Sequence, residues 1–316
     1  MAQDEFEVIS KYFRRSTEDP GVLLGIGDDA AVVNSTSPIA ITTDTLVSGV
    51  HFPSGISGDV VGHRLLAANL SDLAAMGAKP RWCTLAMTLE EIDEQWLSGF
   101  SSGFFNLAEK YDVSVIGGDL TRGPLTVTAQ LFGICEEDYV LTRSGGKVGD
   151  EIYVTGSLGD SAAGLSIIDD LDVSDEKLFL KNRFLRPVPR VEEGVALRGM
   201  ASAAIDISDG LLADLGHICN ASGCGAVIDL EKIPLSKELC SLYPVEEAHT
   251  FALSGGEDFE LCFTAPPSKR SAIKEAFKNL DTNAYLVGKL DGQQGLICRR
   301  EGIPFEPISK GYLHFT

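Results

Sequence analysis

Short apolar runs, separated by Gly, Pro, Asp and Asn, alternate with stretches whose apolar residues recur three and four positions apart. The first pattern predicts β-strands and the second predicts amphipathic helices. In the first half of the chain, one helix is expected from Asp59 to Gly77 and another from Asp93 to Tyr111, because Asp is a preferred N-cap and Gly commonly ends a helix. The strands expected in this half cover residues 22–24, 30–33, 39–42, 82–88, 113–116 and 125–135.

A second series of strands and helices follows a linker in which Gly145, Gly146 and Gly149 are concentrated. Strands are expected at residues 152–155, 203–207, 227–230, 261–264 and 285–287. Helices are expected at residues 159–168, 186–197, 211–221 and 268–280, and an exposed acidic turn at 169–175. A chain of 316 residues is long enough for two cores. We therefore expect two mixed α/β domains, residues 1–137 and 151–316, joined by a linker at 138–150.

The charge of the chain excludes some classes of partner. The 26 basic and 46 acidic residues give a formal charge of -20, which argues against nucleic acid, whose phosphates require Lys and Arg patches. No apolar run approaches the roughly 18 residues of a membrane span, and the acidic first residues do not fit a secretory signal. Seven cysteines without a CxxC pair indicate free thiols in a reducing compartment. A cytoplasmic enzyme is expected.

Acidic residues recur inside short segments that contain Gly, Ser or Thr. A single Asp beside Gly usually marks a turn, but a rigid scaffold that presents several such carboxylates can make them converge. Converged carboxylates repel one another unless a hard cation such as Mg²⁺ lies between them. The pattern therefore predicts a protein that binds Mg²⁺ and phosphate. The segments are Gly27-Asp28-Asp29, Thr43-Asp44-Thr45, Ser71-Asp72, Gly117-Gly118-Asp119, Asp206-Ile207-Ser208-Asp209-Gly210 and Gly255-Gly256-Glu257-Asp258.

Several familiar motifs are absent or misleading. The stretch from Gly25 to Ala30 matches a dinucleotide fingerprint only superficially, because two carboxylates stand where the pyrophosphate would lie. The chain has no Walker loop, no zinc-type His spacing and no nucleophile elbow at a strand-to-helix turn. Arg143 and Lys147 remain open to two interpretations: they hold outer phosphate oxygens, or they are solvated residues of the linker.

Taken in order, the acidic motifs resemble those of the thiamine-monophosphate kinase family. The match also includes His51-Phe52, Asn69-Leu70-Ser71-Asp72, Leu141-Thr142-Arg143 and Leu253-Ser254-Gly255-Gly256-Glu257-Asp258, and it extends from Glu5 to Tyr312. The wider superfamily includes aminoimidazole-ribonucleotide synthetase and selenophosphate synthetase. The resemblance implies ATP-dependent phosphorylation of thiamine monophosphate to thiamine diphosphate. It also implies an N-terminal domain that pairs into a dimeric β-barrel flanked by helices, a mixed-sheet C-terminal domain, and ATP in a cleft between the domains.

The resemblance assigns residues to three tasks. Several Mg²⁺ ions would be held by Asp29, Thr42, Thr43, Asp44, Asp72, Asp119, Asp206 and Asp209. ATP would be contacted by Gly118, Asp119, Arg143 and Ser208, and the thiamine phosphate by His51, Glu257 and Tyr312. No role follows for Asp28, Lys147 or Asp258.

The chemistry of the acceptor removes the need for a catalytic base. A phosphate monoester is largely dianionic at pH 7, so its oxygen attacks the γ-phosphoryl group directly. We therefore expect in-line transfer assisted by metal, with Asp44 and Asp119 the most critical residues. Two alternatives stay open: another enzyme of the superfamily, such as aminoimidazole-ribonucleotide synthetase, and an acidic Ca²⁺-binding or interaction protein that is not an enzyme. The second would crowd its ligands into one short loop.

Overall fold

The computed structural model describes residues 5–15, 17–27 and 30–305, and it shows a mixed α/β protein of two compact units. Unit 1 comprises the chain up to Leu73 together with Ala78–Asp138. Unit 2 comprises Ala74–Gly77 and the chain from Tyr139 onward. Within the described ranges, no helix combines the length and the apolar character needed to cross a bilayer.

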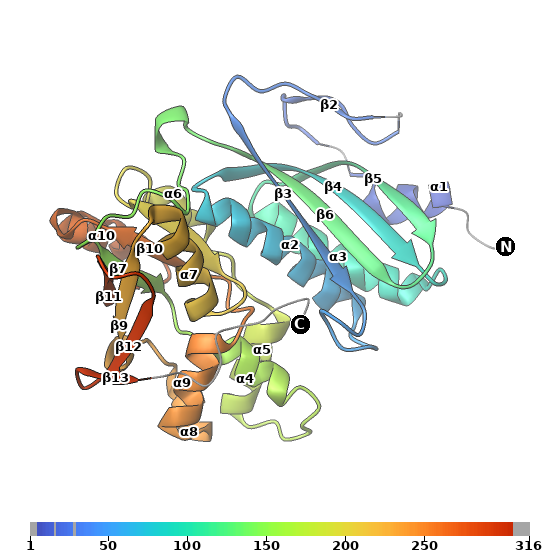
Figure 1. The fold of residues 1–316 in the computed structure, drawn as a ribbon. Coiled ribbons are helices and arrows are strands. Elements are labelled where there is room, and N and C mark those ends of the chain that lie inside the picture. Colours follow the sequence, from blue (N-terminus) through green and yellow to red (C-terminus); the bar gives the residue numbers. More distant parts are fainter. Residues whose placement is uncertain (1–4, 16, 28–29, 306–316) are drawn as a thin grey trace. The chain divides into compact units, whose positions relative to one another are not determined.

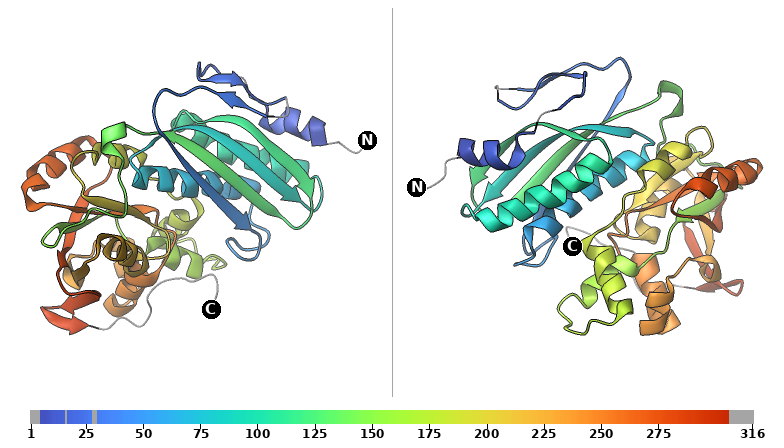
Figure 2. Two further views of the ribbon diagram at one scale, coloured as in Figure 1. Left: turned by 45° about the horizontal axis from the view of Figure 1, so that its top comes forward. Right: turned by 180° about the vertical axis from the view of Figure 1, so that it is seen from behind.

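Unit 1 is built on a four-stranded sheet in the order β3-β6-β4-β5, covered on one face by two helices (Figures 1 and 2). The strands are β3 (Ile39–Val47), β4 (Lys79–Leu89), β5 (Ser114–Arg122) and β6 (Thr126–Ile134), and the helices are α2 (Gly58–Ala75) and α3 (Glu94–Lys110). Strand β6 is antiparallel to both of its neighbours, whereas β4 and β5 are parallel. Strands β3 and β5 are therefore the two edges of this sheet.

Smaller elements precede this sheet. They are α1 (Glu5–Val8), the π-helix η1 (Ile9–Phe13) and the hairpin of β1 (Val22–Leu24) with β2 (Val32–Val33). Asp19, just before β1, accepts hydrogen bonds from Arg81 Nε, Arg81 Nη2, Trp82 Nε1 and Gly21 N at 2.6–2.9 Å. The carboxylate of Asp19 thus attaches this segment to β4.

The sequence of the two helices explains how closely they pack. Asp93 caps α3 by accepting hydrogen bonds from the N–H groups of Gln95 and Trp96, as the sequence predicts. A Cβ atom on Gly62 would lie 2.3 Å from the carbonyl oxygen of Phe100, and one on Gly103 would lie 1.9 Å from that of Asp59. Only glycine permits this close approach of α2 to α3. The two helices thus pack together against one face of the sheet (Figures 1 and 2).

Unit 2 contains a seven-stranded sheet in the order β13-β12-β9-β11-β7-β10-β8. Its strands are β7 (Glu151–Thr155), β8 (Ala203–Ile207), β9 (Gly225–Asp229), β10 (Glu260–Ala265), β11 (Ala284–Asp291), β12 (Leu296–Arg300) and β13 (Ile303–Phe305). Its helices are α4 (Asp160–Ser166), α5 (Asp175–Leu185), α6 (Val191–Ala196), α7 (Leu211–Ser222), α8 (Lys237–Leu242), α9 (Val245–Ser254) and α10 (Arg270–Ala276). Strands β7, β8 and β10 are buried along their whole length and contribute to the hydrophobic core. All seven cysteines are free, and only Cys240 is exposed.

The structure corrects several expectations about these elements. Asp44 does not lie at a strand end, because β3 continues to Val47, and Gly117-Gly118-Asp119 is not a turn after a strand, because it lies inside β5. In both places the neighbouring strand continues to pair past the acidic segment, which local sequence does not reveal; β5 resumes pairing with β4 at Gly117 after a register shift. The helices α5, α8 and α9 and the strands β12 and β13 were not expected. The expected helix at 268–280 is shorter, with 3₁₀ turns on both sides of α10.

Candidate functional site

The carboxyl groups of Asp44 and Asp72 lie side by side in unit 1. Asp44 lies on the face of β3 that meets α2, which carries Asp72, and Thr42 on the same face donates a hydrogen bond from its hydroxyl to Asp72 Oδ2. Burial raises the pKa of Asp44 to about 7, and the negative charge of Asp72 contributes to the shift. The pair is therefore a site of electrostatic repulsion in the protein without a bound cation.

These residues fit a hard cation. Mg²⁺ is usually held by one or two carboxylates and completes its shell with water and phosphate oxygens. Asp44, Asp72 and Thr42 present such oxygens. Over the described ranges, no three side chains of His, Cys, Asp or Glu form a ready cation cage. A cation at this pair would thus depend on ligands from water and phosphate. Asp29, also expected as a ligand, lies outside the described residues.

Asp119 lies on the opposite face of the sheet from Asp44. Strand pairing places Thr45, Thr128, Ala86 and Asp119 in one row, and Asp44, Ala129, Leu85 and Gly118 in the next row. Paired residues share a face and successive residues alternate, so the two aspartates point to opposite sides.

Asp44 and Asp119 also lie on the two edge strands, about 14 Å apart at the usual interstrand spacing. Thr43 lies on the same face of the sheet as Asp119, the face opposite to Asp44. Its hydroxyl accepts a hydrogen bond of 3.0 Å from Gln130 Nε2. One copy of the sheet therefore brings Thr42, Asp44 and Asp72 together, but it does not bring Asp119 to them.

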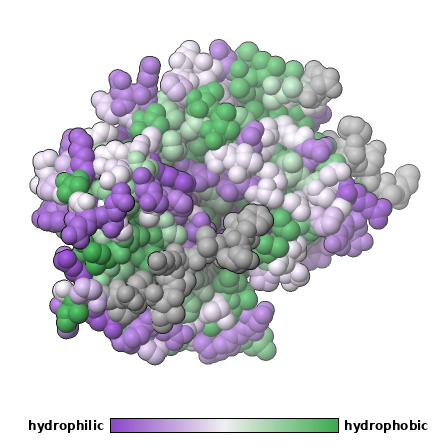
Figure 3. All heavy atoms as spheres, viewed as in Figure 1, coloured by the Kyte–Doolittle hydropathy of each residue, from purple (hydrophilic) through white to green (hydrophobic). Residues whose placement is uncertain are grey.

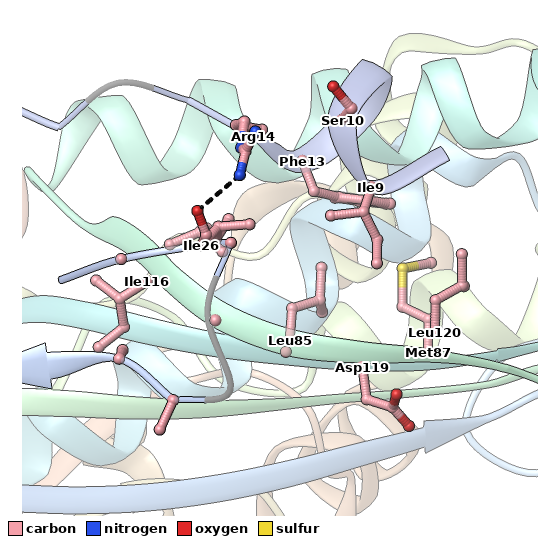
Figure 4. Close-up of a pocket in the computed structure, with 17 residues that line it drawn as sticks. Ile9, Ser10, Phe13, Arg14, Ile26, Leu85, Met87, Ile116, Asp119 and Leu120 are labelled. Atoms are coloured by element: carbon pink, nitrogen blue, oxygen red, sulfur yellow. Dashed lines mark hydrogen bonds between the residues drawn. The ribbon is translucent and has the colours of Figure 1, made fainter. Parts of the chain in front are cut away.

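A cavity of about 660 Å³ lies beside β5 in unit 1. Figure 4 shows Leu85, Met87 and Leu120 pointing toward Ile9 and Phe13 of η1, whereas the carboxylate of Asp119 points away from them. Arg14 donates a hydrogen bond of 3.0 Å to the carbonyl oxygen of Ile26 at the rim. The backbone of Gly117-Gly118-Asp119 forms part of the wall. The volume is that of a small-molecule site, and the lining combines apolar side chains with Ser10, Arg14 and Asp119.

Gly118 is required by the packing of β5 against β4. A Cβ atom at this position would lie 1.9 Å from the carbonyl oxygen of Leu85, whereas one on Gly117 would meet nothing closer than Thr84 Cγ2 at 3.7 Å. The glycine at 118 thus sets the position of the strand that carries Asp119.

His51 follows β3 and is oriented by the backbone. Its Nδ1 accepts a hydrogen bond of 3.0 Å from the N–H of Val47. This bond places the proton of a neutral ring on Nε2, which becomes the donor side of the imidazole. Tyr312, which is also expected to contact the thiamine phosphate, lies outside the described residues.

Two segments of unit 2 are joined by backbone hydrogen bonds. Ser208, Asp209 and Gly210 form the turn from β8 into α7, and Asp206 is buried in β8 just before it. The N–H of Glu257 donates to Ser208 O at 2.8 Å, and that of Phe259 donates to Ile207 O at 3.0 Å. The structure therefore brings Ser208 and Glu257 together. Asp206 and Asp209 lie close to Ser208 in the sequence.

The loop that carries Glu257 has an unusual backbone. Glu257 and Phe259 both have positive φ angles, 70° and 51°, a conformation that costs a non-glycine residue about 1–2 kcal/mol. Such strain persists only where the surrounding contacts impose it. The loop is thus held in one conformation rather than left to local preference.

Arg143 and Lys147 lie in the exposed segment before β7. The carbonyl oxygen of Arg143 accepts a hydrogen bond from Ser222 Oγ at 3.3 Å, and the N–H of Lys147 donates to Asp150 Oδ2 at 3.0 Å. Both contacts involve the backbone. They position the segment, and the two side chains are exposed to solvent.

Sequence reasoning missed two buried carboxylates that organise these loops. Asp214 accepts hydrogen bonds from the turn at 208–210, and Asp258 accepts from Gly159 N at 2.6 Å and Ser161 N at 3.1 Å. Burial raises the pKa of each to about 7. An Asp in the first turn of a helix is a known sequence signal and could have identified Asp214. Asp258, for which the sequence suggests no role, is 1% exposed and connects its loop to α4.

The chain is similar to known proteins along its whole length. The family described as AIR synthase related protein matches with its N-terminal domain over residues 27–135 and with its C-terminal domain over residues 147–300. The chain is 49% identical to the thiamine-monophosphate kinase of Escherichia coli (strain K12), covering 100% of this chain and 99% of that protein.

Two solved structures extend the similarity to the fold. The thiamine-monophosphate kinase of Stenotrophomonas maltophilia K279a superposes with a TM-score of 0.86 at 42% identity, covering 91% of this chain and 93% of that one. A structure described as AaThiL complexed with AMPPCP and TMP gives a TM-score of 0.78 at 34% identity, with 92% of each chain covered.

Proposed function

Because the chain belongs to the thiamine-monophosphate kinase family, we propose that it transfers the γ-phosphoryl group of ATP to thiamine monophosphate. The products are thiamine diphosphate and ADP. The observation that carries this proposal is the pair of adjacent carboxylates, Asp44 and Asp72, with the hydroxyl of Thr42. Two adjacent carboxylates with a nearby hydroxyl are typical ligands of a Mg²⁺ ion that binds together with a polyphosphate. We therefore assign the pair to cation binding and not to proton transfer.

Mg²⁺ is the cation proposed for this pair, and it would neutralise charge between two polyanions. In addition to Asp44, Asp72 and Thr42, its proposed ligands are Asp29, Thr43, Asp119, Asp206 and Asp209. No residue is given the role of general base, because the phosphate of the acceptor is already an anion at pH 7. The task of the chain is to bring two anions into line and to hold them there.

ATP is proposed to contact Gly118, Asp119, Arg143 and Ser208. The cavity beside β5 supports the first two, because the backbone of both residues lines it. Arg143 supplies a guanidinium suited to phosphate oxygens.

The thiamine phosphate is proposed to contact His51, Glu257 and Tyr312. The Nε2–H of His51 is a donor for a phosphate oxygen. The carboxylate of Glu257, whose backbone N–H is fixed by Ser208 O, is an acceptor or a partner for a cationic ring.

We also propose that two copies of the chain pair through unit 1. Large apolar side chains are exposed on β1, β2 and the first half of β3, and Figure 3 shows apolar surface over the β1–β2 hairpin. The sheet has two unpaired edges, β3 and β5, and closure with the sheet of a second copy would remove them. Closure would also place β5 of one copy beside β3 of the other, so that Asp119 of one copy and Asp44 of the other would lie on neighbouring strands.

The decisive experiment incubates the purified full chain with ATP, Mg²⁺ and thiamine monophosphate and scores both products. Thiamine diphosphate and ADP should form in equal amounts, and chelation of Mg²⁺ should stop both. Release of inorganic phosphate with another acceptor, and none with thiamine monophosphate, would instead favour a different enzyme of the superfamily.

A cytoplasmic location, where ATP is available, is part of the same proposal.

A further inference from the structure

Asp214 is a buried carboxylate in the first turn of α7 and is only 2% exposed. Its Oδ2 atom accepts three hydrogen bonds, each of 3.1 Å, from the backbone N–H groups of Ser208, Asp209 and Gly210. Three successive N–H groups directed at one point form a concave anion site in the backbone. In this protein the carboxylate of Asp214, in the helix that follows the turn, occupies this site.

The carboxylate of Asp214 holds the turn that enters α7. Gly210, the residue before α7, has a φ of 115° and provides no side-chain cap. The first N–H groups of a helix and the turn before it lack partners within the helix. If Asp214 lost its acceptor oxygen, three N–H groups would lose this partner; the cost would be about 1–3 kcal/mol for the buried N–H of Gly210 and less for the partly buried N–H groups of Ser208 and Asp209.

The same turn supports the segment that carries Glu257. Ser208 O accepts from the N–H of Glu257, and Ile207 O accepts from the N–H of Phe259. A Cβ atom on Gly256 would lie 2.4 Å from Ser208 O, so the two segments are in direct contact. A change in the direction of the Ser208 carbonyl therefore moves Glu257 as well.

We propose that Asp214 is a positioning residue that holds the Ser208–Gly210 turn, and through it Glu257, in the geometry that ATP and the thiamine phosphate require. Asp214 does not touch either substrate in this scheme, because its oxygen is already occupied by the turn. The inference rests on the proposed function for its kinetic consequences. Its structural part stands on the hydrogen bonds alone.

The structural part is tested in the ligand-free wild-type protein by hydrogen exchange of the backbone amides. The amides of Ser208, Asp209 and Gly210 should be protected to an extent comparable with the middle of α7. Exchange of these amides at the rate of an unstructured peptide would overturn the proposal. This measurement does not require a variant to fold, and it does not require the protein to be a kinase.

The kinetic part is tested with Asp214→Asn, which keeps the shape and one acceptor oxygen but removes the charge that strengthens the bonds. Exchange at residues 208–210 should accelerate about tenfold. The KM values for both ATP and thiamine monophosphate should rise, and kcat/KM should fall about a hundredfold.

Glu151→Gln is the matched control. Glu151 is another buried carboxylate of unit 2, 1% exposed, that accepts from Arg270 and Tyr153. It pairs with Ala265 of β10, at the far end of that strand from Glu260, which pairs with Ile207. This variant should lose stability but keep wild-type KM values.

If the kinetic losses of the two variants simply follow their losses of stability, Asp214 is a structural residue and the proposal is wrong. If the wild-type protein shows amide protection but phosphorylates no thiamine monophosphate, the proposed function fails while the support of the turn by Asp214 stands.

Discussion

The backbone N–H of Glu257 donates a hydrogen bond of 2.8 Å to the carbonyl oxygen of Ser208. The two residues are 49 positions apart in the chain, and the resemblance assigns them to different substrates. Their contact means that the turn proposed for ATP and the loop proposed for the thiamine phosphate are held as one block. Binding of one substrate to this block can therefore order the site of the other.

Glu257→Gly should relieve the backbone strain at this position and remove the carboxylate, and the two changes should have separate effects on stability and on KM. Glycine adopts positive φ without cost, so the free energy of unfolding should rise by about 1 kcal/mol. Loss of the carboxylate should raise the KM for thiamine monophosphate about tenfold or more and leave the KM for ATP nearly unchanged. Chemical denaturation and steady-state kinetics measure the two effects. Glu257→Gln is the control: it should show the same KM increase without the gain in stability.

Asp44→Asn and Asp119→Asn should each abolish activity, yet a mixture of the two inactive proteins should recover it. If the sites combine Asp44 of one copy with Asp119 of the other, each mixed dimer contains one intact site. Random exchange makes about half of the dimers mixed, so activity should reach about a quarter of the wild-type value. The measurement is the kinase assay after subunit exchange. A mixture that stays inactive, despite proven exchange, would place both aspartates of a site in the same copy.

Asp44→Asn should stabilise the protein when Mg²⁺ is absent. The substitution removes one of two adjacent carboxylates in a partly buried position, so unfolding at pH 8 in a chelating buffer should cost about 1–2 kcal/mol more than in the wild type. Saturating Mg²⁺ with ATP should stabilise the wild type and reduce or reverse this difference. Thermal unfolding with and without the ligands tests this. Equal stability of both proteins in chelating buffer would show that the pair is not repulsive.

Asp19→Asn should destabilise unit 1 in a pH-dependent way. The guanidinium of Arg81 holds the pKa of Asp19 below its ordinary value, with burial opposing this shift. The stabilisation is therefore present above the ordinary value near pH 4 and is lost as the pH falls below it. The variant should be about 1–3 kcal/mol less stable at pH 7, with a smaller deficit at pH 3. Denaturation at both pH values measures this difference. Glu90→Gln, at an exposed acid of the same unit, should show no such dependence.

Gly118→Ala should damage the sheet, whereas Gly117→Ala should be tolerated. The added methyl group at 118 collides with the backbone carbonyl of Leu85, which cannot move without breaking the pairing of β4 and β5. We expect a loss of about 2–3 kcal/mol and weaker ATP binding for Gly118→Ala, against less than about 1 kcal/mol for Gly117→Ala. Unfolding curves and calorimetric titration with ATP and Mg²⁺ compare the two. Similar behaviour of both variants would argue against the close approach at 118.

Local sequence predicted the elements whose signals are strong. The helices α2 and α3 and the strand β8 agree closely with expectation, because Asp93 caps α3 and residues 203–207 form an apolar run bounded by polar residues. The helix α5 was missed although Ser174 caps it, because the acids around Asp172 suggested a turn. The interior of β5 was missed because two glycines normally end a strand, and only the partner strand β4 supplies the reason that they do not.

The ordered motifs of the sequence determined which family this chain belongs to and which acids and hydroxyls it offers to metal and phosphate. Identity of residues at fixed positions is enough for that, since related chains share a fold. Only the tertiary structure decided which of those groups meet. The face of Asp44 follows from alternation along one strand, but its contact with Asp72 and its separation from Asp119 follow from strand order. Strand order is set by hydrogen bonds and packing between residues far apart in the chain, which no local pattern contains.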